Sequence, residues 1–265
     1  MTDYALQLSD VEVQRYLRMA TFARTAEAEQ WALAGIAPGA RVADVGCGPG
    51  AVTVTMAEIV GDAGTVNGVD GDPLAIELAT SLIAQAGRSN ATAVVGAADA
   101  TGLEPSSYDV VVMRHVLAHN GGQEQAIVDH LASLVRPGGC VYVADAVLTA
   151  IRTRGMPPEI DEIGQRYVDY QTSRGNDMEI GLRLGELITG ADLELVDFRG
   201  SYSIVATPPG VRPPPWAARE AMIAAGFATP EDVERWDAAY AEVDAMTEPP
   251  TLFLPGFTAI GRRSS

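Results

Sequence analysis

The sequence predicts an α/β protein built on a doubly wound, mostly parallel sheet. From residue 41 to about 147, short apolar runs alternate with segments of helical spacing. A glycine-rich loop follows the first apolar run, and an acidic residue ends the second. Strands that alternate with helices are typical of a parallel sheet covered on both faces. Ligands of such sheets bind at the carboxyl ends of the strands.

Five strands are predicted in this central segment. They are 41–46, 64–70, 91–99, 108–113 and 138–147. The helices between them are 51–60, 73–87 and 123–135. The second of these helices opens with Pro73, which suits a first-turn position.

Helical segments flank the alternation on both sides. Residues 9–35 contain two helical stretches, and Ser9 with Glu12 fits a capping box at the first. Residues 157–187 are predicted to be helical, with a break near "SRGND". Two long strands follow, at 193–206 and 251–263, and helices are expected between them at 217–225 and 230–246. A chain of 265 residues fits one compact domain with additions.

The composition limits the kinds of partner that we expect this protein to bind. The formal net charge is −17, and all 18 basic side chains are arginine. We therefore expect no nucleic-acid partner, because phosphate contacts need a basic face. No apolar run approaches the roughly 20 residues of a membrane span, and the N-terminal residues do not resemble an export signal. Cys47 and Cys140 are far apart, which predicts free thiols, no metal site and a cytoplasmic location.

The stretch "VADVGCGPG", Val42–Gly50, identifies the ligand class. Its glycines run G-x-G-x-G rather than G-x-G-x-x-G, and Asp44 stands two residues before the first. A carboxylate there disfavours an anion and favours a cationic ligand. Asp70, 20 residues after Gly50, ends the second strand, where a carboxylate can hold ribose hydroxyls. S-adenosylmethionine has both the ribose and the positive centre, whereas a nicotinamide oxidoreductase is disfavoured by the spacing.

Five motifs in order carry a resemblance to a known family. They are "VADVGCGPG", "VNGVDGDP", "VVGAADATGL", "YDVVVMRHVLAH" and "LVRPGGCVYVADA". With them, the chain resembles class I S-adenosylmethionine-dependent methyltransferases of the UbiE-like small-molecule branch. The resemblance implies a Rossmann-like, seven-stranded sheet whose last strand is antiparallel. It divides the chain into an N-terminal helical cap (1–36), a cofactor-binding core (37–148), a helical lid (149–190) and the last two strands (191–265) with a helical insertion at 208–246.

The resemblance also implies cofactor contacts. The implied cofactor set is Asp44, Gly46, Cys47, Gly48, Gly50, Asp70, Gly71, Asp99, Ala100 and Arg114. Asp70 would hold the ribose, Asp99 and the Ala100 backbone would hold the adenine, and the Arg114 backbone would meet the cofactor's amino group. Each acid also has a plainer interpretation: Asp44 as a solvated strand end, Asp70 as the N-cap before Pro73, and Asp99 as the cap of a short turn.

Three residues past the fourth and fifth strands are candidates for catalysis. His115 and His119 are four residues apart, so one helical turn would place them on one face. We expect His115 to be a general base and His119 to have a more structural role, although a structural role for His115 is as well supported. Asp145 ends the fifth strand and could orient a histidine or bind the acceptor. Methyl transfer needs a base only for some nucleophiles, since the sulfonium is already a good leaving group.

Aromatic side chains in the added helices are candidates for the acceptor pocket. They are Tyr16, Phe22, Tyr167, Tyr170, Trp236 and Tyr240. At helical spacing such residues are more often core, but these helices have little to cover except the open end of the sheet. A roomy helical cover on an acidic chain of bacterial type predicts a medium-sized, mainly apolar metabolite and a monomer or homodimer. A rearrangement or cyclisation that uses the same cofactor remains an alternative, as does a binding protein without catalysis.

Overall fold

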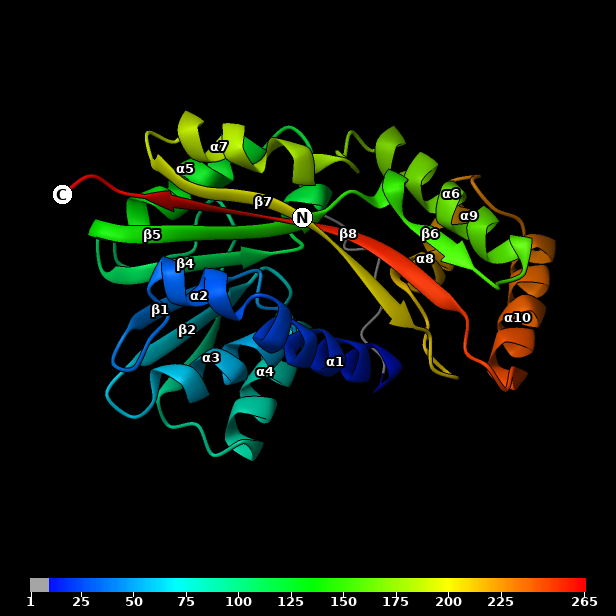
Figure 1. The fold of residues 1–265 in the computed structure, drawn as a ribbon, viewed down its shortest axis with the longest axis horizontal. Helices are drawn as coiled ribbons and strands as arrows, with labels where there is room; N and C mark the ends of the chain where they lie inside the picture. The colour runs from blue at the N-terminus through cyan, green and yellow to red at the C-terminus, as the bar shows by residue number, and fades with distance from the viewer. Residues whose placement is uncertain (1–9) are drawn as a thin grey trace.

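The computed structural model describes residues 10–265, and its centre is an eight-stranded mixed sheet (Figure 1). The strands are β1 (Arg41–Val45), β2 (Thr65–Asp70), β3 (Ala91–Val95), β4 (Tyr108–Arg114), β5 (Val135–Ala146), β6 (Arg152–Arg154), β7 (Glu194–Ala206) and β8 (Thr251–Arg262). Their order is β3-β2-β1-β4-β5-β8-β6, and β7 pairs with β8. The first five strands are parallel, and β8 is antiparallel to β5. The predicted doubly wound architecture is confirmed.

Helices cover both faces of the sheet. They are α1 (Asp10–Ala26), α2 (Ala28–Ala34), α3 (Ala51–Val60), α4 (Pro73–Gln85), α5 (Glu124–Leu134) and α7 (Leu184–Gly190). Figure 1 shows α1 to α4 below the sheet and α5 and α7 above it. One apolar cluster lies under each layer, with β1 and β4 contributing to both. Strands buried on both faces read as near-continuous apolar runs, which is why the sequence identified them.

The sheet has one strand more than predicted. The three-residue β6 pairs antiparallel with Thr251–Phe253 at the outer end of β8. Strand β8 is longer than its pairing with β5, which ends at Gly256. Its free edge beyond that point is satisfied by β6, because unpaired strand edges are disfavoured. Nothing in the three residues themselves indicated a strand.

The outer half of the β7–β8 hairpin carries a group of helices that we call the lid. The lid consists of α6 (Pro158–Ser173), α8 (Pro214–Ala217), α9 (Arg219–Ala224) and α10 (Pro230–Ala245). In Figure 1 these helices lie together at one end of the molecule. They share an apolar cluster of their own, which includes Trp236 and Tyr240. Helix α10 begins with a complete capping box from Thr229 and Asp232, behind Pro230.

Several boundaries differ from the sequence prediction. The segment 149–190 is not wholly lid, because β6 joins the sheet and α7 packs on β7 and β8. The third strand ends at Val95, and Ala97–Ala100 form a tight bridge instead of its last residues. The proposed capping box of Ser9 and Glu12 lies outside the residues whose side chains are described. Among residues 10–265, no helix is long and apolar enough to cross a membrane.

Candidate functional site

The loop after β1 holds three glycines in left-handed backbone. Gly46, Gly48 and Gly50 have φ values of 76°, 53° and 81°, where other residues are strained. A side chain at Gly46 would run into Val116, whereas one at Gly48 would only touch the ring of Tyr16, at 3.4 Å. Gly46 is therefore required for packing, and Gly48 leaves the backbone bare on the side that faces α1.

The backbone N–H groups of this loop are used inside the protein. The N–H groups of Gly46 and Cys47 donate to the Val69 carbonyl, and that of Gly50 donates to the Cys47 carbonyl. The Gly48 N–H donates to Asp70 Oδ2, and all four N···O distances are 2.7–3.1 Å. Pro49 has no N–H. A phosphate cradle needs N–H groups that point at the anion. The geometry thus disfavours a pyrophosphate ligand, for a reason that the glycine spacing alone did not reveal.

Two carboxylates lie beside the loop, Asp44 buried and Asp70 half-buried. Asp44 is 3% exposed and accepts a 2.6 Å hydrogen bond from Thr53 Oγ1. Burial raises the pKa of Asp44 to about 6, and burial also raises the pKa of Asp70. Each negative charge held out of water favours a positive ligand nearby. The site is therefore suited to a sulfonium and an ammonium group.

Asp70 is placed to hold a ribose. Its Oδ1 accepts from Asp72 N at 3.0 Å and its Oδ2 from Gly48 N at 2.8 Å. Each oxygen keeps a second lone pair that can accept from a hydroxyl. The cap of α4 is Asp72, whose carboxylate accepts from Leu74 N at 2.9 Å. Asp70 is thus not the helix cap that the plainer interpretation required.

The predicted adenine contacts are placed less favourably. Asp99 is exposed. The Ala100 N–H donates to the Ala97 carbonyl at 3.1 Å, so the backbone donor expected for adenine is already used. Gly71 follows β2, and a side chain there would meet little besides the Gly96 carbonyl, at 3.9 Å. The open space at Gly71 suits a planar ring. The carboxylates of Asp44 and Asp70 are acceptors that fit the ribose hydroxyls and the positive charge of S-adenosylmethionine.

Arg114 turns its side chain away from this site, toward the N-terminal helices. Its guanidinium donates to Glu27 from Nε at 2.9 Å and from Nη2 at 2.5 Å. Tyr142 OH and Trp31 Nε1 donate to the same carboxylate, at 2.6 and 3.2 Å. Burial would raise the pKa of Glu27, but Arg114 outweighs it and the pKa is lowered. Sequence analysis missed Glu27, because its partners are up to 115 positions away.

This four-residue network fixes the N-terminal helices on the sheet. Glu27 is the single residue between α1 and α2, and Arg114 is the last residue of β4. The orientation of α1 therefore depends on Arg114, at the end of β4 directly before His115. Through α1, the network also places the ring of Tyr16 over Gly48.

His115 and Asp145 face each other at the ends of β4 and β5. His115 has a left-handed backbone, with φ of 57°, and its N–H donates to the Ala144 carbonyl. Its Nδ1 lies 3.8 Å from Oδ1 of the buried Asp145. The same carboxylate accepts from Ala118 N and Ala146 N, at 3.2 and 2.9 Å. A non-glycine residue held at positive φ is often found at functional sites.

The expected helical turn through His115 and His119 is wrong. Only Leu117–His119 is helical, as a short 3-10 turn, because the positive φ of His115 excludes it from a helix. Both histidines nevertheless lie within electrostatic reach of Asp145. Burial lowers the pKa of His119, so its ring is neutral at pH 7.

The six aromatic candidates divide into three groups. Tyr167 packs edge-on against His119, with ring centroids 6.5 Å apart, and Tyr170 lies one turn further along α6. Tyr16 comes from α1, and Phe22 on the same helix is 44% exposed. Trp236 and Tyr240 lie inside the lid's apolar cluster, to which Tyr167 and Tyr170 also belong. Among the six, Tyr167 contacts His119 and Tyr16 lies against Gly48.

A close approach of two loops positions α6 against His119. Gly121 follows the 3-10 turn, and its N–H donates to Asn176 Oδ1 at 3.1 Å. Asn176 Nδ2 in turn donates to Gln171 Oε1 at 2.7 Å. A side chain at Gly121 would collide with the Gly175 backbone. Sequence analysis missed Gly121 and Asn176, since the contact joins the "SRGND" break to a loop 55 residues earlier.

Known proteins that resemble this chain are methyltransferases. A family model described as a methyltransferase domain matches residues 42–139. A ubiquinone biosynthesis O-methyltransferase of Cupriavidus pinatubonensis is 31% identical over 178 residues, which cover 63% of this chain and 65% of the relative. The aklanonic acid methyltransferase DauC of a Streptomyces strain is 31% identical over 121 residues, 46% of this chain and 54% of the relative. The chain thus spans less than two thirds of either relative.

Solved structures share the fold. The YcgJ protein of Bacillus subtilis has a TM-score of 0.59 at 15% identity, over 95% of this chain and 99% of that one. A SAM-dependent methyltransferase of Aquifex aeolicus has a TM-score of 0.53 at 16% identity, over 72% and 92%. At such identities the likeness concerns the fold alone. Residues 42–139 thus match a methyltransferase domain, in a fold that a solved methyltransferase shares.

Proposed function

We propose that this protein transfers the methyl group of S-adenosylmethionine to a small-molecule acceptor held beside His115. One observation carries the proposal: the buried carboxylate of Asp44 and the half-buried carboxylate of Asp70 flank a glycine loop whose N–H groups are all used internally. That combination favours a cationic ribonucleoside over a nucleotide. His115 and Asp145 stand at the ends of the two neighbouring strands, where an acceptor would lie.

The residues of the chain have distinct tasks in this reaction. Asp70 holds the ribose hydroxyls, and Asp44 offsets the cofactor's positive charge. When bound, the cofactor supplies an activated methyl group on a sulfonium leaving group. His115 Nε2 takes the proton of the acceptor's nucleophilic atom, since Nδ1 faces Asp145. The Asp145 carboxylate faces the imidazolium that results, and loss of the proton to solvent restores the neutral imidazole beside the carboxylate.

The relatives' names favour oxygen as the acceptor atom. One is named an O-methyltransferase of ubiquinone biosynthesis and the other an aklanonic acid methyltransferase. We extend this to a hydroxyl or carboxyl oxygen on a secondary metabolite, within the UbiE-like small-molecule branch. Cytoplasmic location and a monomer or homodimer without nucleic-acid or membrane partners complete the proposal. The unpaired Cys47 and Cys140 are compatible with a reducing compartment.

Two measurements test the function. Calorimetry should show micromolar binding of S-adenosylhomocysteine and none of NAD, and Asp70→Ala should weaken the first. S-adenosylmethionine labelled at the methyl group should then pass its label to members of a panel of phenols and aromatic acids. Absence of S-adenosylhomocysteine binding would refute the proposal. Conversion of a metabolite without label transfer would instead support a rearrangement that uses the cofactor's charge.

A further inference from the structure

Strand β7 lies at one edge of the sheet and is 13 residues long. It pairs with β8 along its length, and among residues 10–265 no strand lies on its other side. Figure 1 shows it along the front of β8. The strand at the opposite edge, β3, has five residues. A long free edge offers unpaired backbone groups to other chains, and proteins normally shorten such edges or interrupt them with lysine, proline or bulges.

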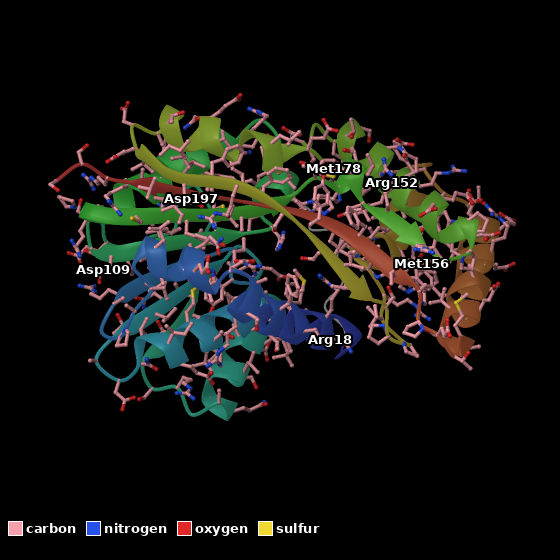
Figure 2. All side chains as sticks on the ribbon, viewed as in Figure 1. Arg18, Asp109, Arg152, Met156, Met178 and Asp197 are labelled. Carbon is pink, nitrogen blue, oxygen red and sulfur yellow. The ribbon has the colours of Figure 1, made fainter. Side chains whose placement is uncertain are left out.

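Most of β7 has none of these protections. The chain contains no lysine, β7 contains no proline, and its one irregularity lies near its start, between Leu195 and Asp197. The charges between residues 195 and 207 are Asp197, seen in Figure 2, and Arg199, which donates to Asp197 twice at 2.7 Å. In a chain with a net charge of −17, this edge is therefore a locally neutral surface that a second acidic copy can approach.

The backbone groups on the free side of β7 belong to its even-numbered residues. The Thr207 N–H donates to the Pro250 carbonyl at 2.9 Å, so Thr207 bonds toward β8. Bonded and non-bonded pairs alternate along an antiparallel ladder, so the odd-numbered residues before Thr207 bond toward β8 as well. Tyr202 opposite Pro255 agrees with this, because proline has no N–H for the ladder. The residues that direct N–H and C=O groups outward are thus Phe198, Gly200, Tyr202 and Ile204.

The side chains of the same residues contribute to an exposed apolar stripe. Phe198, Tyr202 and Ile204 are 42%, 63% and 70% exposed. Phe253 of β8 stacks on Tyr202 at 4.8 Å between ring centroids and is 36% exposed. At about 200 Å² for a fully exposed side chain of this size, the stripe presents roughly 400 Å² of apolar surface. A standard interface buries about 800 Å² per partner, of which the stripe is half and the free backbone edge supplies a further part.

The outer half of the β7–β8 hairpin has little support within its own copy. The pairing of β8 with β5 ends at Gly256, and the strand that follows on that side is the three-residue β6. Among the described residues, the lid's apolar cluster includes none from β7 or β8. A two-stranded hairpin is marginally stable in water, whereas additional strands with an apolar face stabilise it. The outer half of the hairpin therefore gains most from a strand along its free edge.

We propose that a second copy of this chain pairs with β7, antiparallel and about a two-fold axis that passes through Ser201. Both copies then use the same surface, as in other two-fold dimers. The two sheets become one continuous sheet, in which the outer halves of the two hairpins form four neighbouring antiparallel strands. The inference goes beyond the methyl transfer proposed above and does not depend on it.

The side chains that meet across the axis favour this register. The partner's Tyr202 lies opposite Gly200, and an aromatic residue across from a glycine compensates for the missing side chain. The partner's Ile204 lies opposite Phe198, which is a favourable pair of an aromatic and a β-branched residue. An axis at Arg199 would instead place two like charges opposite each other. The axis at Ser201 thus uses the exposed apolar residues of β7 and avoids the like charges.

The mass of the protein in solution tests the interface. Light scattering at about 10 µM should give the parent twice the 27.8 kDa of one chain. Ile204→Arg should weaken the dimer at least about tenfold, because it places a charge opposite an aromatic ring at two symmetric positions. Leu33→Arg is the matched control, since Leu33 is 43% exposed on α2, and it should leave the mass unchanged. Circular dichroism of both variants should match the parent, because both side chains are exposed.

Cysteine cross-linking tests the register. Residues in a non-bonded antiparallel pair have α-carbons about 4.5 Å apart, a distance that a disulfide spans. Ser201→Cys should therefore link two copies under mild oxidation, whereas Ser203→Cys should not, because its counterpart lies four residues away along the partner strand. The parent should stay unlinked, since Cys47 and Cys140 are buried. A monomeric parent at about 100 µM, a mass unchanged by Ile204→Arg, or no cross-link through Ser201→Cys would each overturn the inference.

Discussion

Replacing Asp44 by asparagine should stabilise the ligand-free protein while it weakens cofactor binding. The carboxylate is buried, and its pKa rises from 3.8 to about 6 on folding. A raised pKa means that the folded state binds the proton more tightly, so ionisation destabilises the fold as pH rises from about 4 through 6. Asparagine cannot ionise, and its oxygen can still accept from Thr53 Oγ1.

The pKa shift of Asp44 sets the size of the expected change in the free energy of unfolding. At 1.36 kcal/mol per pKa unit, the ionised Asp44 costs about 3 kcal/mol at pH 8. At pH 5 the folded protein is mostly protonated at this group, and the cost is about 1.6 kcal/mol by the same linkage relation. The free energy of unfolding of Asp44→Asn minus that of the parent should therefore grow by about 1.4 kcal/mol between pH 5 and pH 8.

Urea unfolding at the two pH values measures this difference. Asp109→Asn is the control: burial raises the pKa of Asp109, but hydrogen bonds from Arg41 N and Arg136 outweigh it and lower the pKa. Its contribution is present above about pH 4 and lost only below, so Asp109→Asn should destabilise equally at pH 5 and pH 8. A difference for Asp44→Asn that is the same at both pH values would refute the reasoning. So would an unchanged affinity for S-adenosylmethionine.

The remaining predictions concern three other residues. Glu27→Ala leaves the guanidinium of Arg114 buried without its carboxylate and should lower the free energy of unfolding by about 3–5 kcal/mol in urea; a loss below 1 kcal/mol would mean that the network does not hold the N-terminal helices. The depressed pKa of Glu27 makes that loss present above about pH 4.5 and smaller as pH falls further, which acid titration of the variant and the parent checks. Asp70→Ala removes two charge-assisted ribose bonds, each worth on the order of 1.5–3 kcal/mol, and calorimetry should show at least a hundredfold weaker binding of S-adenosylhomocysteine. His115→Ala should lower turnover by about 10²–10⁴-fold with cofactor affinity unchanged, and near-normal turnover across pH would leave positioning as the whole mechanism.

Local patterns were enough to predict the core. Strands β1, β4 and β5 are apolar because both faces are covered, so each appears in the sequence as a short apolar run. The glycine loop and Asp70 each lie within a few residues of a strand end, and that end is where a parallel sheet binds its ligand. Asp44, Asp70 and the positions of His115 and Asp145 were therefore identified from sequence.

Such local patterns could not predict contacts between residues that are far apart in the sequence. Glu27 meets Arg114 across 87 positions and Tyr142 across 115, and no local signal marks an acid for burial with a distant arginine. Tyr167 and Tyr240 both lie in the lid's apolar cluster, yet the ring of Tyr167 also contacts His119, whereas that of Tyr240 contacts Trp216. Helical spacing gives the face of a helix but not the neighbour that covers it.

The sequence by itself determined the sheet, its cofactor loop and the carboxylates that suit a cationic ribonucleoside, because strand periodicity and loop geometry depend on neighbours along the chain. Only the tertiary structure decided that the loop's N–H groups are all used, that His115 has left-handed backbone, and that β6 completes the edge of β8. It alone brought the ring of Tyr167 on α6 against His119. Burial and hydrogen-bond satisfaction are properties of the packed chain, and residues far apart in sequence decide them together.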